Sequence, residues 1–431
     1  MHIKDFAKSG SPKTLFSAFI YFDISFMIWV MLGPLGNSIG EQFHLTAGQK
    51  GLMTGLPVLS GSLLRLVLGA LADRIGGRKT ALIGLSLTFV PLLLGGLAAN
   101  SYEMVLLIGL MLGIAGASFA VALPLASRWY PPEQQGLVLG IAGAGNSGTV
   151  LASLFAPRLA AAFGSWQPVL LVAIFPVAFA WLIVALLAKD APGKPRARTL
   201  KDYGAVLRQR DTLWFSLMYG VTFGGFVGLS TFLPIFFHDQ YGLDKISAGN
   251  FAALCVFAGS FVRPIGGFLA DRFGGIRILL GLYGAIGVLA LVVGGLPPLG
   301  LETMFLFIMM TLLGSGNGSV FQIVPQRFPK EIGIVTGIVG AVGGIGGFLL
   351  PNLLGSLKDS TGTYASGFMV YTVAAFACSA LIVAVSGGWQ RSWAGRGGRV
   401  RVDRVVTPPV TTPNVEAASM PTLNVSESAA D

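Results

Sequence analysis

The sequence predicts an all-α membrane protein in which twelve transmembrane helices form two six-helix halves of the same orientation. Three observations predict this class: the composition, the recurrence of long apolar segments, and an internal repeat. Of the 431 residues, 53% are hydrophobic and only 11% are charged, whereas soluble proteins carry about 25% charged residues. With a mean hydropathy of +0.73, the chain lacks the polar surface needed to dissolve in water.

Apolar segments of about 20 residues recur along most of the chain, and each could cross a hydrocarbon layer of roughly 30 Å as a helix. Short segments of alternating polarity, typical of a β-barrel, are absent from the sequence. We predict spans at 14–38, 48–72, 80–98, 103–128, 134–160, 166–188, 212–238, 246–271, 276–297, 302–326, 332–355 and 365–386.

The distribution of charge predicts the orientation of these spans. Loops after even-numbered spans are rich in Lys and Arg, and the loop 189–211 adds seven more, whereas the opposite loops are acidic or nearly neutral. Because Lys and Arg accumulate in cytoplasmic loops, we expect both termini in the cytoplasm. Basic loops can also bind nucleic acid, but their position beside membrane helices already explains them. We therefore expect a lipid bilayer, and no nucleic acid, as partner.

An internal repeat indicates that the two halves are copies. Residues 61–77 read GSLLRLVLGALADRIGG and residues 259–275 read GSFVRPIGGFLADRFGG, with ten of seventeen positions identical. Parallel halves of this kind are typical of transporters whose substrate site lies near the midplane. We expect the following organisation: an N-terminal half at 1–188, a cytoplasmic linker at 189–211, a C-terminal half at 212–386 and a disordered cytoplasmic tail at 387–431.

One arginine of each copy lies deep in a predicted span. Arg65 precedes Asp73 by eight residues, which places it about 12 Å from the cytoplasmic helix end. Arg263 stands in the same relation to Asp271. A guanidinium at that depth costs roughly 2.5–3.5 kcal/mol, and neither span has an acidic partner near its middle. Intramembrane arginines are therefore candidates for a functional site.

The pair favours a small oxyanion as ligand. About 10 Å apart, two such charges repel by about 1.7 kcal/mol at an effective dielectric constant near 20. An anion between them removes this repulsion and supplies oxygens to both planar guanidinium groups. The alternative is structural, with each arginine paired to backbone carbonyls. Glycines flank both residues at i−4 and i+4 and leave room for neighbouring helices.

The loop G-x-x-x-D-R-x-G-G-R-K at 69–79, with its counterpart at 267–277, resembles the cytoplasmic signature of the major facilitator superfamily. The resemblance covers about residues 14–386 and implies the major facilitator fold. It also implies that four charged residues belong to a cytoplasmic gate in which ion pairs lock one conformation: Asp73, Arg74, Asp271 and Arg272. The alternative is that they are ordinary loop charges.

The glycine-rich segment GIAGAGNSG at 140–148 suggests a dinucleotide-binding motif, but that motif requires a βαβ unit and this segment lies in an apolar helix. Residues 117–148 instead closely resemble bacterial members of the nitrate/nitrite porter family. This resemblance implies that Arg65 and Arg263 bind nitrate and that Asn146 forms a hydrogen bond to it. The second glycine-rich segment has Gly343 at the place equivalent to Asn146.

The same resemblance implies that three aromatic residues line the site and sandwich a planar ion: Phe119, Tyr219 and Phe223. Nitrate is flat and weakly hydrated, which suits guanidinium groups between aromatic walls. In a chain with 30 Phe, packing within the bundle or against lipid is the alternative for each ring.

The expected mechanism is alternating access by rocking of the two halves. Nitrate uptake against an inside-negative potential costs about 2.3 kcal/mol per 100 mV, so it needs a coupled driver, whereas exchange for nitrite is charge-neutral. We expect proton-coupled nitrate uptake, with nitrate/nitrite antiport as the alternative. Asp23 is the carboxylate well inside a span, and either proton coupling or a structural role accounts for it.

The expected protein is a monomeric multi-pass protein of the cytoplasmic (inner) membrane that binds nitrate or nitrite, with protons as the coupling ion. No metal-ligand cluster, activated nucleophile or cofactor loop appears in the sequence, so we expect no enzyme activity, metal or cofactor. A carrier for another small anion, such as an organic carboxylate, stays open. A membrane sensor is the further alternative, but it would require a soluble signalling domain.

Overall fold

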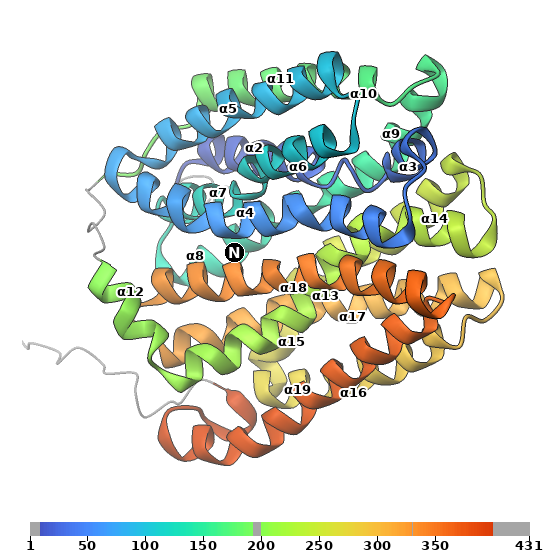
Figure 1. Cartoon of the computed structure of the whole chain (residues 1–431). Coiled ribbons are helices and arrows are strands. Elements are labelled where there is room, and N and C mark those ends of the chain that lie inside the picture. The colour runs from blue at the N-terminus through green and yellow to red at the C-terminus, as the bar shows by residue number, and fades with distance from the viewer. Residues whose placement is uncertain (1–8, 193–199, 330, 400–431) are drawn as a thin grey trace, which may run out of the picture.

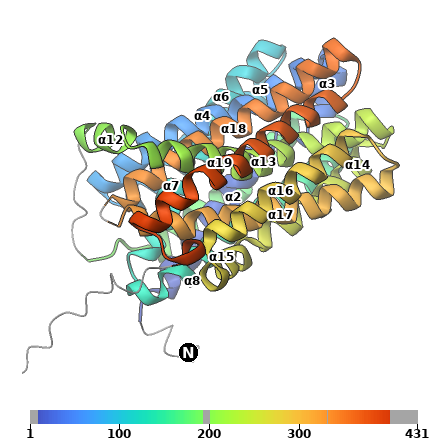
Figure 2. The same cartoon turned by 90° about the horizontal axis from the view of Figure 1, so that it is seen from below.

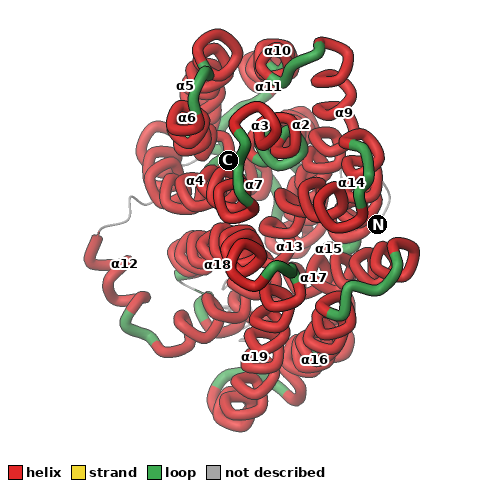
Figure 3. The backbone as a smooth tube through the Cα atoms, turned by 45° about the vertical axis from the view of Figure 1, so that its right-hand side comes forward, coloured by secondary structure: helices red, strands yellow, loops and turns green. Residues whose placement is uncertain are grey.

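The computed structural model describes residues 9–192, 200–329 and 331–399, and within these ranges it is helical without strands (Figure 3). The helices are α2 (Pro12–Trp29), α3 (Gly36–Phe43), α4 (Ala47–Ile75), α5 (Gly77–Ala98), α6 (Tyr102–Gly116), α7 (Phe119–Ser127), α8 (Pro132–Gly143), α9 (Gly148–Phe163), α10 (Gln167–Val172), α11 (Ile174–Leu187), α12 (Leu200–Leu207), α13 (Arg210–Tyr241), α14 (Lys245–Phe261), α15 (Arg263–Phe273), α16 (Gly275–Gly294), α17 (Leu299–Arg327), α18 (Ile332–Thr361) and α19 (Ala365–Ser392), with 3-10 turns η1 (Ala144–Ser147) and η2 (Arg396–Gly398).

In the described part of the chain, eleven helical segments are long and apolar enough to cross a membrane. They correspond to the second through twelfth predicted spans. The first predicted span, 14–38, differs. Helix α2 is only 18 residues long and contains Lys13 and Asp23, and the chain continues from Val30 to Leu35 in short turns before α3 begins. Gly33 and Pro34 lie in these turns, and both residue types disfavour a continuous helix.

The helices form two groups that lie side by side (Figure 1): an N-terminal half made of α2–α11 and a C-terminal half made of α13–α19. Helix α4 packs against α18, and α9 packs against α14, so these two pairs form most of the contact between the halves. The approach of α4 to α18 requires glycine. A Cβ at Gly344 would lie 1.6 Å from Ser62 Oγ, so no larger residue fits there.

The sequence repeat also appears in the packing of the two halves. A Cβ at Gly61 would lie 2.9 Å from Gly113 O, and a Cβ at Gly259 would lie 2.6 Å from Met310 O. The i−4 glycines therefore do admit a neighbouring helix, as predicted. The i+4 glycines do not serve this purpose, because Cβ atoms at Gly69 and Gly267 would find their nearest neighbours at 3.6 and 3.9 Å.

The predicted linker contains a helix, because α12 lies within 189–211 (Figure 2) and α13 already begins at Arg210. Asp211 is bound into the C-terminal half by ion pairing with Arg327 and by a hydrogen bond from Trp389 Nε1 at 2.8 Å. Residues 193–199 of the linker lie outside the described residues.

The expected boundary of the tail at residue 387 is wrong. Helix α19 continues to Ser392, because the rings of Trp389 and Trp393 pack on Phe215 at centroid distances of 5.0 and 6.2 Å. The following turn is also attached to the bundle, since Gln326 Nε2 donates to Gly398 O at 3.1 Å. Residues 400–431, where we expect disorder, lie outside the described residues.

Candidate functional site

Arg65 is enclosed in the middle of α4, with only 2% of its surface exposed. Its Nη1 donates to Gly340 O of α18 at 2.9 Å, and its Nε donates to Gly116 O of α6 at 3.3 Å. The first of these bonds crosses from the N-terminal to the C-terminal half. Nη2 is buried without a hydrogen-bond partner. Arg65 is thus partly paired with carbonyls, and one donor nitrogen is left over.

Arg263 begins α15 and is only partly buried. Its Nη2 lies 3.4 Å from the hydroxyl of Tyr219, to which it donates a long hydrogen bond, and its Nη1 is buried without a partner. The two arginines come together at one ring. Their guanidinium carbons lie 5.2 and 5.5 Å from the centre of the Phe119 ring, on which both charges are stabilised by cation–π interaction.

The other two aromatic residues of the predicted site also join this cluster. The rings of Tyr219 and Phe223 are stacked, with centroids 4.9 Å apart and planes 5° from parallel. Phe223 lies 4.9 Å from the guanidinium carbon of Arg65, while Tyr219 contacts Arg263 through its hydroxyl. Both are fully buried on the continuous helix α13. The structure therefore brings together five of the six residues predicted to bind the anion.

Asn146 is buried in η1, and its Oδ1 has no hydrogen-bond partner. Its link to the arginine cluster is indirect, since Ser260, three residues before Arg263, lies 3.4 Å from Asn146 O. Asp23 is 6% exposed and accepts a hydrogen bond from Ser147 Oγ at 2.6 Å, directly beside Asn146. The predicted coupling carboxylate, on α2, therefore contacts the turn that carries the predicted amide.

Three of the predicted site residues occupy interruptions in membrane-spanning helices. Phe119 starts α7 after a break at Ala117 and Ser118, Asn146 lies in the 3-10 turn between α8 and α9, and Arg263 starts α15 after Val262. Pro264 explains the last break, because it has no N–H to donate to the preceding turn. Broken helices within a membrane are tolerated where they border a binding cavity, and transporters use them at substrate sites.

The second glycine-rich segment has no room for an amide opposite Asn146. A Cβ at Gly343 would lie 2.4 Å from Tyr219 Cδ1 and 3.3 Å from Phe223 Cδ1. The stacked Tyr219–Phe223 pair thus fills the place that a second asparagine would take. The polar group that the C-terminal half offers beside Arg263 is the hydroxyl of Tyr219.

The resulting arrangement has a defined chemical capacity. Two guanidinium groups, each with a buried nitrogen lacking an acceptor, flank an aromatic ring. Buried donors in native structures normally have partners, and a planar oxyanion presents acceptor oxygens in the geometry that guanidinium groups prefer. These residues fit a small anion better than a cation or a neutral ligand.

The predicted gate residues lie at the opposite end of the bundle from Lys50, at the end we name the Asp73 end. Asp73 Oδ1 pairs with Arg128 Nη2 at 2.7 Å, within the N-terminal half. Arg74, Asp271 and Arg272 are exposed to the surroundings, and the guanidinium of Arg272 lies over the ring of Phe273. In this conformation the Asp73–Arg128 contact ties α4 to the end of α7.

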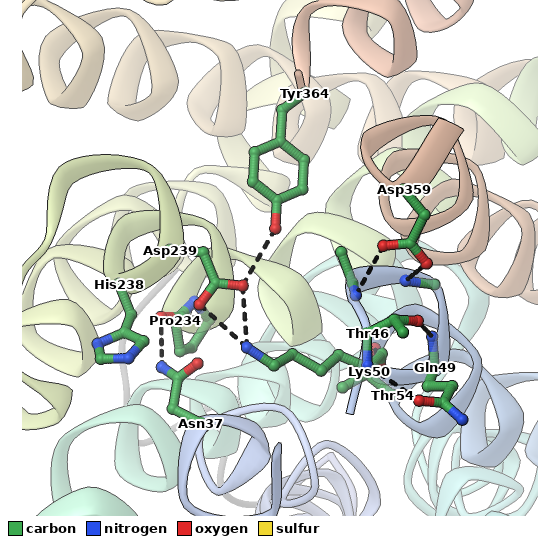
Figure 4. A network of polar contacts seen from close by, with 12 residues as sticks. Asn37, Thr46, Gln49, Lys50, Thr54, Pro234, His238, Asp239, Asp359 and Tyr364 are labelled. Carbon is green, nitrogen blue, oxygen red and sulfur yellow. Dashed lines mark hydrogen bonds and ion pairs between the residues drawn. The ribbon is translucent and has the colours of Figure 1, made fainter. Parts of the chain in front are cut away.

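At the other end, which we name the Lys50 end, polar contacts join the two halves (Figure 4). Lys50 Nζ pairs with Asp239 at 2.9 Å, and Tyr364 OH donates to the same carboxylate at 3.3 Å. The Asp359 carboxylate accepts from the backbone N–H groups of Ala47 and Gly48 at 3.0 and 2.8 Å, at the N-terminus of α4.

Further contacts close the same end. Asn37 Nδ2 donates to Pro234 O at 2.9 Å, and Lys245 pairs with Glu41 at 2.5 Å. Of the ion pairs between described residues, the two that join the halves both lie at the Lys50 end. The structure is therefore closed there.

Sequence reasoning missed several residues of the site. Trp29 lies with its ring 5.2 Å from the guanidinium carbon of Arg65 and donates from Nε1 to Pro57 O at 2.6 Å. The carbonyl of Gly340 and the Lys50–Asp239 pair were missed as well. A backbone carbonyl has no signature in the sequence, but Trp29 follows Asp23 by six residues on the same apolar segment and could have been tested as a site residue.

Comparisons with known proteins agree with this architecture. The family model of the Major Facilitator Superfamily matches residues 14–351. A solved bacterial homologue of the human lysosomal transporter Spinster, in an inward-facing and occupied conformation, has the same fold. Its TM-score is 0.64 at 19% identity, covering 88% of this chain and 97% of that one.

Three relatives cover most of the chain. The nitrite extrusion protein of Bacillus subtilis is 36% identical, covering 83% of this chain and 90% of the relative. The probable nitrate/nitrite antiporter NarK1 of Thermus thermophilus is 34% identical, covering 83% and 88%. The probable nitrate transporter NarT of Staphylococcus epidermidis is 31% identical, covering 84% and 92%. With its helical membrane fold, the chain belongs to the Major Facilitator Superfamily and, within it, to the nitrate/nitrite porters, which are transporters and not enzymes.

Proposed function

We propose that this protein is a secondary active transporter that carries nitrate, and also nitrite, across the cytoplasmic membrane by alternating access. One observation carries the substrate class: a guanidinium from each half lies against the Phe119 ring, and each keeps a buried nitrogen without an acceptor. The names of the relatives support nitrate and nitrite among the anions that fit.

The geometry of the cluster supports binding roles for the two arginines and the three aromatic residues, and the resemblance to the porter family supports that of Asn146. Arg65 and Arg263 grip the anion from the two halves, Asn146 adds an amide, and Phe119, Phe223 and Tyr219 line the site as flat walls. Because Arg65 is hydrogen-bonded to Gly340 across the halves, anion binding and the contact between the halves share one side chain. This supports a site that alternates between two accessible sides while the anion stays between the arginines.

We assign the Asp73 end to the cytoplasm, as the charge distribution predicts, and the closed Lys50 end to the outside. The proposed gate at Asp73, Arg74, Asp271 and Arg272 would then form its pairs between the halves in the opposite, outward-facing conformation. The closure at Lys50 and Asp239 supports gating that alternates between the two ends, since alternating access requires that one end be closed while the other opens.

Uptake into proteoliposomes tests the substrate. Vesicles containing the purified protein should accumulate labelled nitrate, and unlabelled nitrate and nitrite should compete while acetate and other small carboxylates should not. Equal competition by carboxylates would contradict the assignment to nitrate. Unimpaired nitrate uptake by both Arg65→Lys and Arg263→Lys would contradict the assigned site.

Proton-coupled uptake is the proposed mode, with Asp23, a buried carboxylate beside Asn146, as the coupling group. Nitrate/nitrite exchange is the second candidate, favoured by the antiporter named among the relatives. Electrical recording on the proteoliposomes distinguishes the two. Symport with two or more protons moves net positive charge inward, whereas one-for-one exchange is electrically silent and depends on nitrite in the opposite compartment.

A further inference from the structure

Helix α2 and the turn η1 are connected by a short hydrogen bond between side chains. Ser147 Oγ donates to Asp23 Oδ1 at 2.6 Å. Ser147 is the residue after Asn146 and the last residue of the turn. Asp23 thus contacts the turn that carries the proposed substrate amide.

The backbones of the two elements also touch at this point. A Cβ at Gly148 would lie 2.0 Å from Asp23 O, and a Cβ at Gly145 would lie 2.7 Å from Phe22 Cδ1. Only glycine permits this approach, so the positions on both sides of Asn146 and Ser147 are set by α2. Phe22 in turn contacts Phe119, with ring centroids 5.6 Å apart. The contact therefore connects the turn to the ring shared by the two arginines.

The geometry of the turn decides where the Asn146 side chain points. A 3-10 turn advances by about 120° per residue and an α-helix by about 100°, so a change from one to the other turns each successive side chain by about 20°. The sequence GAGNSG has a weak intrinsic preference for either form because it is rich in glycine. A tertiary hydrogen bond to Ser147, the last residue of the turn, then favours the 3-10 form.

The contact with the other half is weaker. Ser260 Oγ lies 3.4 Å from Asn146 O but 2.9 Å from Val256 O, and a hydroxyl has one proton to donate. Its proton therefore goes mainly to Val256, in its own helix. The turn is attached firmly to α2 and loosely to α14, so it moves with the N-terminal half when the two halves separate.

We infer that Asp23 is a positioning residue for anion binding: through Ser147 it fixes the 3-10 turn that aims the amide of Asn146 at the anion. This inference rests on the proposed anion site. It assigns Asp23 a role that is present whether transport is proton-coupled or an exchange, because the hydrogen bond serves binding and not the driving force.

Nitrate binding to the purified full-length protein tests this role, with the equilibrium dissociation constant of every variant measured at one fixed pH because protonation of a coupling group is linked to substrate affinity. Ser147→Ala removes the donor to Asp23 and should raise the Kd for nitrate about fivefold, as expected for the loss of one hydrogen bond to a charged group. Ser147→Thr restores a hydroxyl and should recover most of the affinity. Ser153→Ala is the matched control, because Ser153 is a buried serine of α9 whose Oγ has no partner.

A double substitution separates positioning from general stability. Asn146→Ala should raise the Kd about tenfold, and adding Ser147→Ala to it should then change nothing, because no amide remains to be aimed. If the fivefold effect of Ser147→Ala persists in the Asn146→Ala background, or if Ser147→Ala binds nitrate like Ser153→Ala, the inference is overturned.

The transport rates complete the test. In nitrate counterflow the Ser147→Ala effect should appear in KM while kcat stays within about twofold, because a positioning defect acts on the bound anion. Should Ser147→Ala not fold, Asp23→Asn keeps an oxygen acceptor and should raise the Kd less than Asp23→Ala does. Equal effects of these two would contradict the role. A wild-type protein that binds no nitrate at all would instead refute the proposed function.

Discussion

Arg65 and Arg263 occupy equivalent places in the sequence repeat, yet their surroundings differ. Arg65 is buried, bonded to carbonyls of both halves, and close to three aromatic rings, those of Trp29, Phe119 and Phe223. Arg263 is only partly buried and has one long hydrogen bond and one ring contact. The comparison indicates different roles for the two side chains. The Arg65 guanidinium is held in place before the anion binds, whereas the Arg263 side chain can change its position to contact the anion.

The cause of this difference lies in the two helices. Arg65 is in the middle of the continuous helix α4, which is packed along α18. Arg263 follows a break, and the proline after it removes a backbone hydrogen bond from the start of α15. The two copies of the repeat therefore both contain the arginine, but the helix around Arg65 is continuous whereas the helix before Arg263 is interrupted.

The largest effect is expected from Arg65→Lys. An ammonium group cannot reproduce two directed bonds to carbonyls together with three ring contacts, so nitrate kcat/KM should fall at least about 100-fold, or about 3 kcal/mol. Nitrate uptake into proteoliposomes measures this. Arg391→Lys is a matched control, since Arg391 lies on the surface of α19 and donates to Gly387 O. A loss below tenfold would show that Arg65 is not the fixed partner.

Arg263→Lys should cost less, about tenfold in nitrate kcat/KM and mainly through KM. The existing contact at 3.4 Å is weak, and a lysine at this partly buried position can still reach the anion as a point charge. The same uptake assay, run on both variants side by side, checks the order. An equal or greater loss of nitrate kcat/KM in Arg263→Lys would contradict the proposed difference between the two arginines.

Gly343→Asn tests whether the C-terminal half can hold an amide at the place equivalent to Asn146. We expect a loss of about five- to tenfold in nitrate kcat/KM. The new side chain would displace Tyr219 from its stack on Phe223 and from Arg263, an overpacking that typically costs about 1–3 kcal/mol. Gly284→Ala on α16 is the control, because a Cβ there meets nothing within 4 Å. Improved nitrate affinity would mean that the C-terminal half can accommodate an amide after all.

The two arginines of this site could be predicted from the sequence on physical grounds, whereas Asn146 and the three aromatic residues followed from the family resemblance. The cost of a guanidinium in a bilayer singles out Arg65 and Arg263, and the repeat gives their relation. What could not be predicted depends on tertiary contact. The break before Phe119 interrupts a segment that is apolar on both sides, and the carbonyl of Gly340 belongs to the backbone, whereas the break before Arg263 has a signal in Pro264.

The ends of the helices were missed for a similar reason. The tail boundary at residue 387 followed from polar composition alone, whereas Trp389 and Trp393 extend the helix by packing on Phe215, a residue far away in the sequence. The first span was predicted as one helix because its apolar composition was given more weight than Gly33 and Pro34, which mark the turns between Trp29 and Gly36.

The smallest effect is expected at the Lys50–Asp239 ion pair. This pair joins the two halves at the Lys50 end of the bundle, whereas the hydrogen bond from Arg65 to Gly340 joins them near the middle. Asp239→Asn keeps an acceptor for Tyr364 but removes the charge that faces Lys50. Ion pairs near a surface contribute about 0.2–1 kcal/mol, so the population open at the Lys50 end should rise about two- to threefold. Distance measurements between spin labels at Ala162 and Gly300 report this opening.

Glu41→Gln is the matched control for this last prediction, since it neutralises the other ion pair that joins the halves at the same end. The Glu41 side chain is 58% exposed, against 20% for Asp239. Because water and salt screen exposed charges more strongly, Glu41→Gln should change the population less than Asp239→Asn does. If neither substitution alters the label distances, the bond from Arg65 to Gly340 and the packing of α4 on α18 keep the end closed. The buried arginine would then be both the anion-binding group and the main connection between the halves.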